Sequence, residues 1–205
     1  MNSQMINASA FRYSSIFFNS EFEDILKGII ACYYSIISSG TELPNNENDI
    51  RDIMLSKELY LKNSTFKEAY PPLSNYHFDK ETSENKGRAD IRILHVKPYK
   101  DDDAYYVIEC KRLDGGNTLN RKYITNGIKR FTTKKKYPFY NNTAGMIGFV
   151  VANIDIHQNS TVELALTQTE IVSNFEYSYF SEHRISGASN IIYHLMFNFS
   201  NNIIS

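Results

Sequence analysis

Two apolar runs near the middle of the chain adjoin charged residues, and this pattern limits the possible folds more than any other feature. Residues 105–108 (YYVI) lead directly into Glu109 and Lys111, and the preceding run, IRILHV, begins just after Arg88 and Asp90. Burying an unpaired charge costs far more than burying an apolar side chain, so these charges need solvent or a bound ion. The pattern therefore predicts either a solvated strand edge or an ion-binding site.

The segments RADIRILHV and AYYVIECKR flank the polar turn KPYKDDD and are predicted to pair as an antiparallel hairpin. If the turn centres near Lys100, paired residues have numbers that sum to about 200. Asp90 then lies beside Glu109 and Lys111. These last two residues are two apart and project to the same face, while Cys110 points to the other face. Two carboxylates and one ammonium are thus expected to converge at one end of the strand pair.

A pair of close carboxylates is a candidate site for a hard divalent cation. Neighbouring carboxylates repel each other, and a shared cation relieves that repulsion. Oxygen ligands suit Mg²⁺ or Mn²⁺, and the five histidines are too scattered to offer a zinc site. The alternative is a solvated edge strand with an ordinary cross-strand ion pair. The apolar run before Glu109 favours the buried metal site.

The segment GRADI, followed by YVIECKRL, resembles the PD-(D/E)xK phosphodiesterase superfamily, the restriction-endonuclease-like nucleases. In that family a metal-binding aspartate opens one strand and an E-x-K motif closes the next. Ala89 stands where the named motif has proline. The resemblance covers residues 45–152 or so and implies an α/β fold with a restriction-endonuclease-like core, in which helices flank a mixed central β-sheet.

The resemblance also implies roles for individual residues. Asp90, Glu109 and the backbone carbonyl of Cys110 would hold Mg²⁺ or Mn²⁺. Lys111 would orient or deprotonate the attacking water and offset charge in the transition state. A metal lowers the pKa of bound water and neutralises the phosphate, so the site needs few other catalytic groups.

The family often adds a glutamate from the preceding helix to this site. Glu47 and Glu58 share the helix face of Ile50 and Met54, so periodicity does not separate them. A position in the first turn favours Glu47 as the fourth catalytic residue, with Asp49 a weaker candidate. Glu47 could equally serve only to complement the helix dipole.

A basic stretch follows the hairpin, although the chain as a whole has a formal net charge of −1. After Asp114 there is no acidic residue until Asp155, and aromatic residues are interleaved with the basic ones. Charge runs are usually solvated faces, but beside a metal site they suit binding to a phosphate backbone. We expect nucleic-acid contacts from Lys129 and Arg130 first, and then from Lys134, Lys135 and Arg121.

The remaining periodicity predicts the other elements in outline. An amphipathic helix is expected over residues 20–38, started by a capping box of Ser20 and Glu23. A second helix is expected over about 47–61, and an irregular stretch over 63–75 because it contains a Pro-Pro pair. Further along we expect a helix over 117–136, a strand in 146–154, a strand over 161–167, and a strand or helix over 190–199.

These features predict an endonuclease-type, Mg²⁺-dependent hydrolase of phosphodiester bonds, with DNA favoured over RNA as its partner. The chain is expected to be one domain, residues 1–205, whose family-like core is followed by an extension over 153–205. Double-strand cleavage would require a homodimer or two encounters, and sequence choice would come from loops, the C-terminal segment or a targeting partner protein. Phage defence or restriction is suggested by analogy.

Other function classes stay open at this stage. The same fold could be a catalytically inactive nucleic-acid-binding module, an RNA-directed nuclease or a structural subunit. The sequence shows no secretory signal and no run of about 20 apolar residues that would span a bilayer, so a cytoplasmic protein is expected, without a membrane partner. Cys32 and Cys110 lie in apolar runs and are expected to be reduced core thiols.

Overall fold

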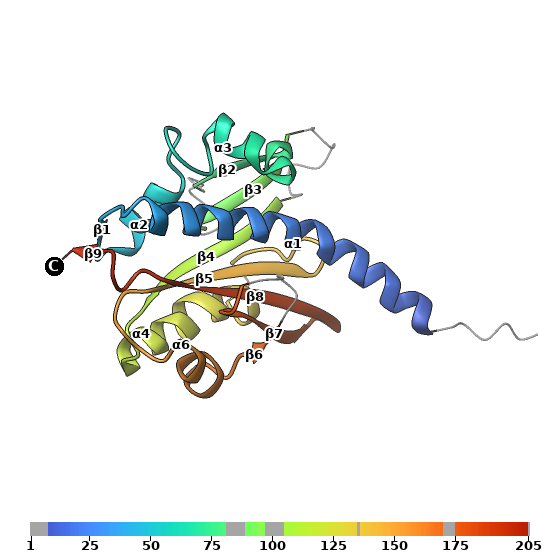
Figure 1. Ribbon diagram of the computed structural model, residues 1–205. Helices are drawn as coiled ribbons and strands as arrows, with labels where there is room; N and C mark the ends of the chain where they lie inside the picture. The colour runs from blue at the N-terminus through green and yellow to red at the C-terminus, as the bar shows by residue number, and fades with distance from the viewer. Residues whose placement is uncertain (1–7, 81–88, 97–104, 135, 170–174, 205) are drawn as a thin grey trace, which may run out of the picture.

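A mixed seven-stranded sheet forms the centre of the protein (Figure 1). Its strand order is β2-β3-β4-β5-β8-β7-β6. The structure is a computed structural model, which describes residues 8–80, 89–96, 105–134, 136–169 and 175–204. Strands β4, β5 and β8 are parallel, and the outer pairs are antiparallel. The predicted α/β class with a mixed sheet is confirmed. The strands are β2 (Tyr76–Asp79), β3 (Ile91–His95), β4 (Tyr105–Leu113), β5 (Thr143–Val150), β6 (Thr167–Gln168), β7 (Ser178–Ile185) and β8 (Ala188–Asn198).

Helix α1 (Ala8–Ser38) covers one face of this sheet, and its N-terminal part projects beyond the strands (Figure 1). Its apolar stripe is almost completely buried, with Phe22, Ile25 and Ile29 each 0% exposed. The predicted start at Ser20 is wrong, since the helix begins earlier and Ser20 lies in its interior. Among the described residues, no helix combines the length and hydropathy needed to cross a bilayer.

The opposite face is covered by one helical segment of three parts, namely α4 (Asn117–Lys122), the π-helical turn η2 (Tyr123–Ile128) and α5 (Lys129–Thr132). The predicted helix over 117–136 is therefore helical to Thr132. Gly127 allows this segment to approach the sheet, because a Cβ there would lie 2.4 Å from Met146 Cε and 3.5 Å from Lys111 Cγ. This close packing brings α5 to strand β4.

Helix α2 (Glu47–Met54) is shorter than the predicted 47–61. Asn46 caps its start by accepting hydrogen bonds from the backbone N–H groups of Asn48 and Asp49. Two short helices, α3 (Ser64–Ala69) and η1 (Pro71–Asn75), occupy the stretch predicted to be irregular. Asn63 caps α3 through the Phe66 N–H, which is a local signal for a helix start.

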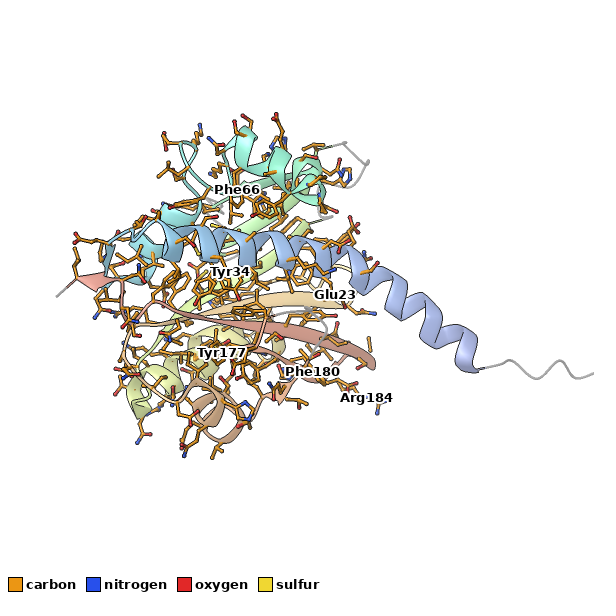
Figure 2. All side chains as sticks on the ribbon, viewed as in Figure 1. Glu23, Tyr34, Phe66, Tyr177, Phe180 and Arg184 are labelled. Carbon is orange, nitrogen blue, oxygen red and sulfur yellow. The ribbon has the colours of Figure 1, made fainter. Side chains whose placement is uncertain are left out.

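Three strands beyond β5, namely β6, β7 and β8, join the same central sheet. The strand expected over 161–167 is wrong, since helix α6 (Ile156–Gln158) continues into the π-helical turn η3 (Asn159–Glu163), and only Thr167 of that range belongs to a strand, β6. Strand β8 pairs with β5, and Arg184 lies near the tip of the β7–β8 hairpin (Figure 2). A two-stranded parallel sheet joins β1 (Leu43–Pro44) to β9 (Ile203–Ile204).

Candidate active site

The register of the β3–β4 hairpin places the predicted site residues side by side. Ile91 pairs with Ile108, so Asp90, which directly precedes β3, lies beside Glu109. The predicted pairing is confirmed for these strands, whereas the turn around Lys100 and residue Arg88 lie outside the described residues. Strand β4 alternates as expected, with Cys110 in the core against α1 and Glu109 on the opposite face.

The ammonium of Lys111 lies at the centre of the site. Its Nζ is 2.8 Å from Glu109 Oε1, 2.9 Å from Glu47 Oε1 and 3.4 Å from Asp90 Oδ2. It also donates a hydrogen bond to the backbone carbonyl of Cys110. Burial alone would lower the pKa of Lys111, but the carboxylates of Asp90, Glu109 and Glu47 raise it above its ordinary value, so the side chain is an ammonium.

The carboxylate of Asp90 is held through both of its oxygens. Oδ2 accepts the backbone N–H of Cys110 at 2.8 Å, in addition to the contact with Lys111. Oδ1 accepts a hydrogen bond from Arg51 Nη1 at 3.0 Å. Arg51 comes from α2, is 1% exposed, and was missed by the sequence-based prediction.

Glu109 is fully buried and shares its Oε1 between two cations. Lys111 lies against this oxygen, and Arg130 donates to it from α5 while its guanidinium stacks over Tyr137 with 5.2 Å between Cζ and the ring centroid. The other oxygen, Oε2, is buried without a hydrogen-bond partner in the described part of the chain. Burial and then the charge of Asp90 raise the pKa of Glu109 to about 7, although both cations oppose the shift.

Glu47 reaches the site from the first turn of α2. Its Oε1 pairs with Lys111, and its Oε2 accepts the backbone N–H of Arg112 at 3.2 Å. Glu58 lies beyond the end of α2, is exposed, and accepts a hydrogen bond from Ser56 instead. Asp49 is exposed as well. The face shared by Glu47 and Glu58 therefore does not exist, because the helix ends at Met54.

The donor set fits a hard cation. Asp90, Glu109, Glu47 and the Cys110 carbonyl offer oxygen alone, which suits Mg²⁺ or Mn²⁺. The partnerless Oε2 of Glu109 is a buried acceptor that a cation would satisfy. Within the described ranges, however, no three His, Cys, Asp or Glu side chains form a ready-made metal cluster. Lys111 lies against each of the donor groups in the present arrangement.

Most of the predicted nucleic-acid contacts lie on the exposed side of the helical segment, or just after its end, rather than in the site. Arg121, Lys129 and Lys134 are exposed, and Lys134 donates to the backbone carbonyl of Thr125. Of the four predicted contact residues that the structure describes, only Arg130 reaches a catalytic candidate, through Glu109. Lys135 lies outside the described residues.

Comparison with known proteins agrees with this geometry. The family model of the PD-(D/E)XK nuclease superfamily matches residues 57–162, more than half of the 205-residue chain. The match includes Asp90, Glu109 and Lys111 but begins after Glu47 and Arg51. No curated protein and no solved structure shows a significant match. The predicted family is confirmed, and the chain belongs to the PD-(D/E)XK nuclease superfamily.

Proposed function

We propose that this protein is a Mg²⁺- or Mn²⁺-dependent nuclease that hydrolyses phosphodiester bonds in DNA, with Asp90, Glu109 and Lys111 as its central residues. The observation that carries the proposal is the convergence of the Lys111 ammonium with three carboxylates in a chain of a nuclease superfamily. Buried charges of this number are costly and are rarely explained by stability alone.

Nucleases of this superfamily generally use divalent metals. In this chain Asp90, Glu109 and the Cys110 carbonyl would hold the ion, with Glu47 as a further oxygen donor. Such an ion supplies a water of lowered pKa and neutralises charge on the phosphate. Glu109 is suited to a cation because its Oε2 is buried without a partner among the described residues, and Asp90 because backbone and side-chain donors fix its orientation.

Lys111 is suited to donating hydrogen bonds rather than to removing a proton. Its raised pKa keeps the side chain charged at neutral pH. An ammonium beside the reacting phosphate would donate a hydrogen bond to the attacking water and so orient it. It would also stabilise the negative charge that grows in the transition state. Proton removal from the water would fall to another group or to solvent.

Arg130 and the exposed basic residues would bind the phosphate backbone. Arg130 joins the exposed face of α5 to the buried Glu109, so it is the cation best placed to contact a phosphate next to the site. Lys129 and Arg121 are exposed on the same helical segment, Lys134 is exposed just after it, and all three would add sequence-independent attraction. Specificity for DNA, a homodimer for double-strand cleavage, a targeting partner and a role in phage defence or restriction are extensions of this proposal by analogy.

The direct test is cleavage of plasmid DNA by the full chain with Mg²⁺ or Mn²⁺, with labelled RNA offered in the same tube. We expect nicked or linear DNA with the wild type and cleavage about 10²- to 10⁴-fold slower with Lys111→Met. Lys27→Met is the matched control, because Lys27 is a half-exposed lysine paired with Asp24 on α1. Nucleic-acid binding without cleavage under either metal would refute the nuclease and favour the binding module, and preferential RNA cleavage would refute the choice of DNA.

A further inference from the structure

Arg51 is a buried cation to which the proposed chemistry assigns no role. Its side chain is 1% exposed, so it is too deeply buried to contact a nucleic acid. An arginine is retained at such a position only where its planar fork of donors is satisfied, because the desolvation of a charge is expensive. The partners of this fork therefore indicate what Arg51 does.

Two carboxylates and one amide share the guanidinium of Arg51. Nε and Nη2 donate to the same oxygen of Asp52, at 2.9 and 2.8 Å. Nη1 donates to Asn48 Oδ1 at 2.9 Å and to Asp90 Oδ1 at 3.0 Å. The two hydrogen bonds to Asp52 thus fix the plane of the guanidinium, and in this plane Nη1 points toward Asp90. Lys80 pairs with the second oxygen of Asp52 and neutralises it.

The position of Arg51 in α2 links it to the rest of the site. Glu47 and Arg51 are four residues apart, so they project from the same side of the helix. Glu47 contacts Lys111, and Arg51 contacts Asp90. Helix α2 therefore holds two of the central residues at once, while strand β4 holds the other oxygen of Asp90 through the Cys110 N–H.

We propose that Arg51 is a positioning residue, which fixes the carboxylate of Asp90 in the orientation that binds the divalent ion. This inference rests on the proposed function. Arg51 acts through Asp90 alone, because its burial keeps it from the substrate. Partners that orient metal ligands typically contribute 10- to 100-fold, as an order of magnitude, to metal affinity.

The test is the affinity of the full chain for Mn²⁺, measured by isothermal titration calorimetry without nucleic acid. Arg51→Lys keeps the charge but loses the fork that bridges Asp52 and Asp90. We expect its Mn²⁺ affinity to fall by about 10- to 100-fold. The metal concentration for half-maximal cleavage should rise by the same factor, while the rate at saturating Mn²⁺ falls much less. Lys62→Met, which breaks a more exposed ion pair with Asp79, is the control and should bind Mn²⁺ like the wild type.

Each outcome decides the inference. A folded Arg51→Lys variant with wild-type Mn²⁺ affinity would show that Arg51 is only a structural ion-pair partner. If that variant does not fold, Asp52→Ala takes its place, because it leaves Arg51 in position but removes the partner that fixes the fork. Unchanged affinity in that variant would equally overturn the inference.

The proposed function fails in a different way. If the wild type binds Mn²⁺ but cleaves neither DNA nor RNA, the nuclease proposal is refuted, and the affinity ratio still decides the role of Arg51. If the wild type binds no Mn²⁺, both proposals are overturned.

Discussion

Strand β4 has two buried faces that differ sharply in chemistry. The face toward α1 carries Tyr106, Ile108 and Cys110, which are all 2% exposed or less, and it is an ordinary apolar core. The face toward the helical segment 117–132 carries Glu109 and Lys111 within an otherwise apolar row. The same backbone and the same sheet therefore support two kinds of interior.

The difference shows that the charges are not required by the fold. Buried ion pairs can often be replaced by apolar residues of similar volume at no cost in stability. The face toward α1 demonstrates that β4 packs well without charge. The charged face is instead maintained by contacts from three separate elements, namely Glu47 and Arg51 in α2, Asp90 before β3 and Arg130 in α5. This convergence is the basis of the proposed active site.

The largest expected effect comes from making the charged face apolar. Lys111→Met should reduce the rate of DNA cleavage by about 10²- to 10⁴-fold, because it removes the ammonium that is proposed to act on the reacting groups. Mn²⁺ binding should persist or strengthen, since the ammonium that contacts the same oxygens is gone. Cleavage kinetics measure the rate, and calorimetry on the same preparation measures the Mn²⁺ affinity. Wild-type cleavage by this variant would show that the charged face is not catalytic.

A cavity on the apolar face should lower the stability of the protein and leave its cleavage rate unchanged. Ile108→Ala removes a side chain that is 0% exposed and should lower the free energy of unfolding by about 2–5 kcal/mol. The fraction that remains folded should cleave DNA at the wild-type rate. Urea unfolding and cleavage assays test the pair of expectations. A catalytic loss in the folded fraction would mean that the two faces of β4 are coupled.

Gly127 lies where the charged face meets the helical segment. In Gly127→Ala the new Cβ would lie 2.4 Å from Met146 Cε and 3.5 Å from Lys111 Cγ, so Met146 must move. We expect a loss of about 1–3 kcal/mol in unfolding free energy together with a reduced cleavage rate. Gly187→Ala, at a positive φ in the β7–β8 turn with open space around it, is the control that should destabilise without slowing cleavage. Equal cleavage rates in Gly127→Ala and Gly187→Ala would show that the packing at Gly127 does not affect the site.

The pH dependence of stability should reveal the burial of Glu109. Its folded-state pKa of about 7 lies above the ordinary value of 4.5, so the folded protein binds this proton more tightly than the unfolded chain. The stabilising contribution is complete below the ordinary pKa and is lost as the pH rises toward 7 and above. Thermal unfolding of the metal-free protein should therefore show a decline with pH that is weaker in Glu109→Gln. An identical pH profile in the two proteins would contradict this pKa.

The smallest effect is expected on the exposed basic surface. Lys129→Ala should weaken DNA binding to a similar extent for all sequences and reduce the slope of log affinity against log salt by about one. Lys27→Ala, on the opposite layer of the fold, should leave that slope unchanged. Fluorescence anisotropy at several salt concentrations measures it. An unchanged slope in Lys129→Ala would place the nucleic acid elsewhere.

Much of the site could be predicted because two-residue periodicity and the hairpin register are strictly local rules. They brought Asp90, Glu109 and Lys111 together without knowledge of the rest of the chain. Arg51 could not be predicted in this way, since an arginine in a short helix normally lies in solvent and its burial follows from tertiary packing. The spacing of four residues from Glu47 was the one available signal.

The fold shows the same division between local and tertiary information. Strands β4 and β5 are apolar enough to be recognised in isolation, whereas β2 and β7 were not predicted. The end of α2 at Met54 and the short helix α3 are fixed by caps and by packing, because helices of this length are marginal without tertiary contacts. The π-helical turn at Tyr123–Ile128 has no periodic signature of its own.

The most direct measurement is a crystal of the full chain soaked in Mn²⁺ and examined for anomalous scattering. The proposed chemistry predicts a peak between the carboxylates of Asp90 and Glu109, with the Lys111 ammonium displaced from at least one of them. If instead the ammonium keeps its place among these carboxylates and no peak appears at saturating Mn²⁺, the proposed metal-dependent nuclease is contradicted.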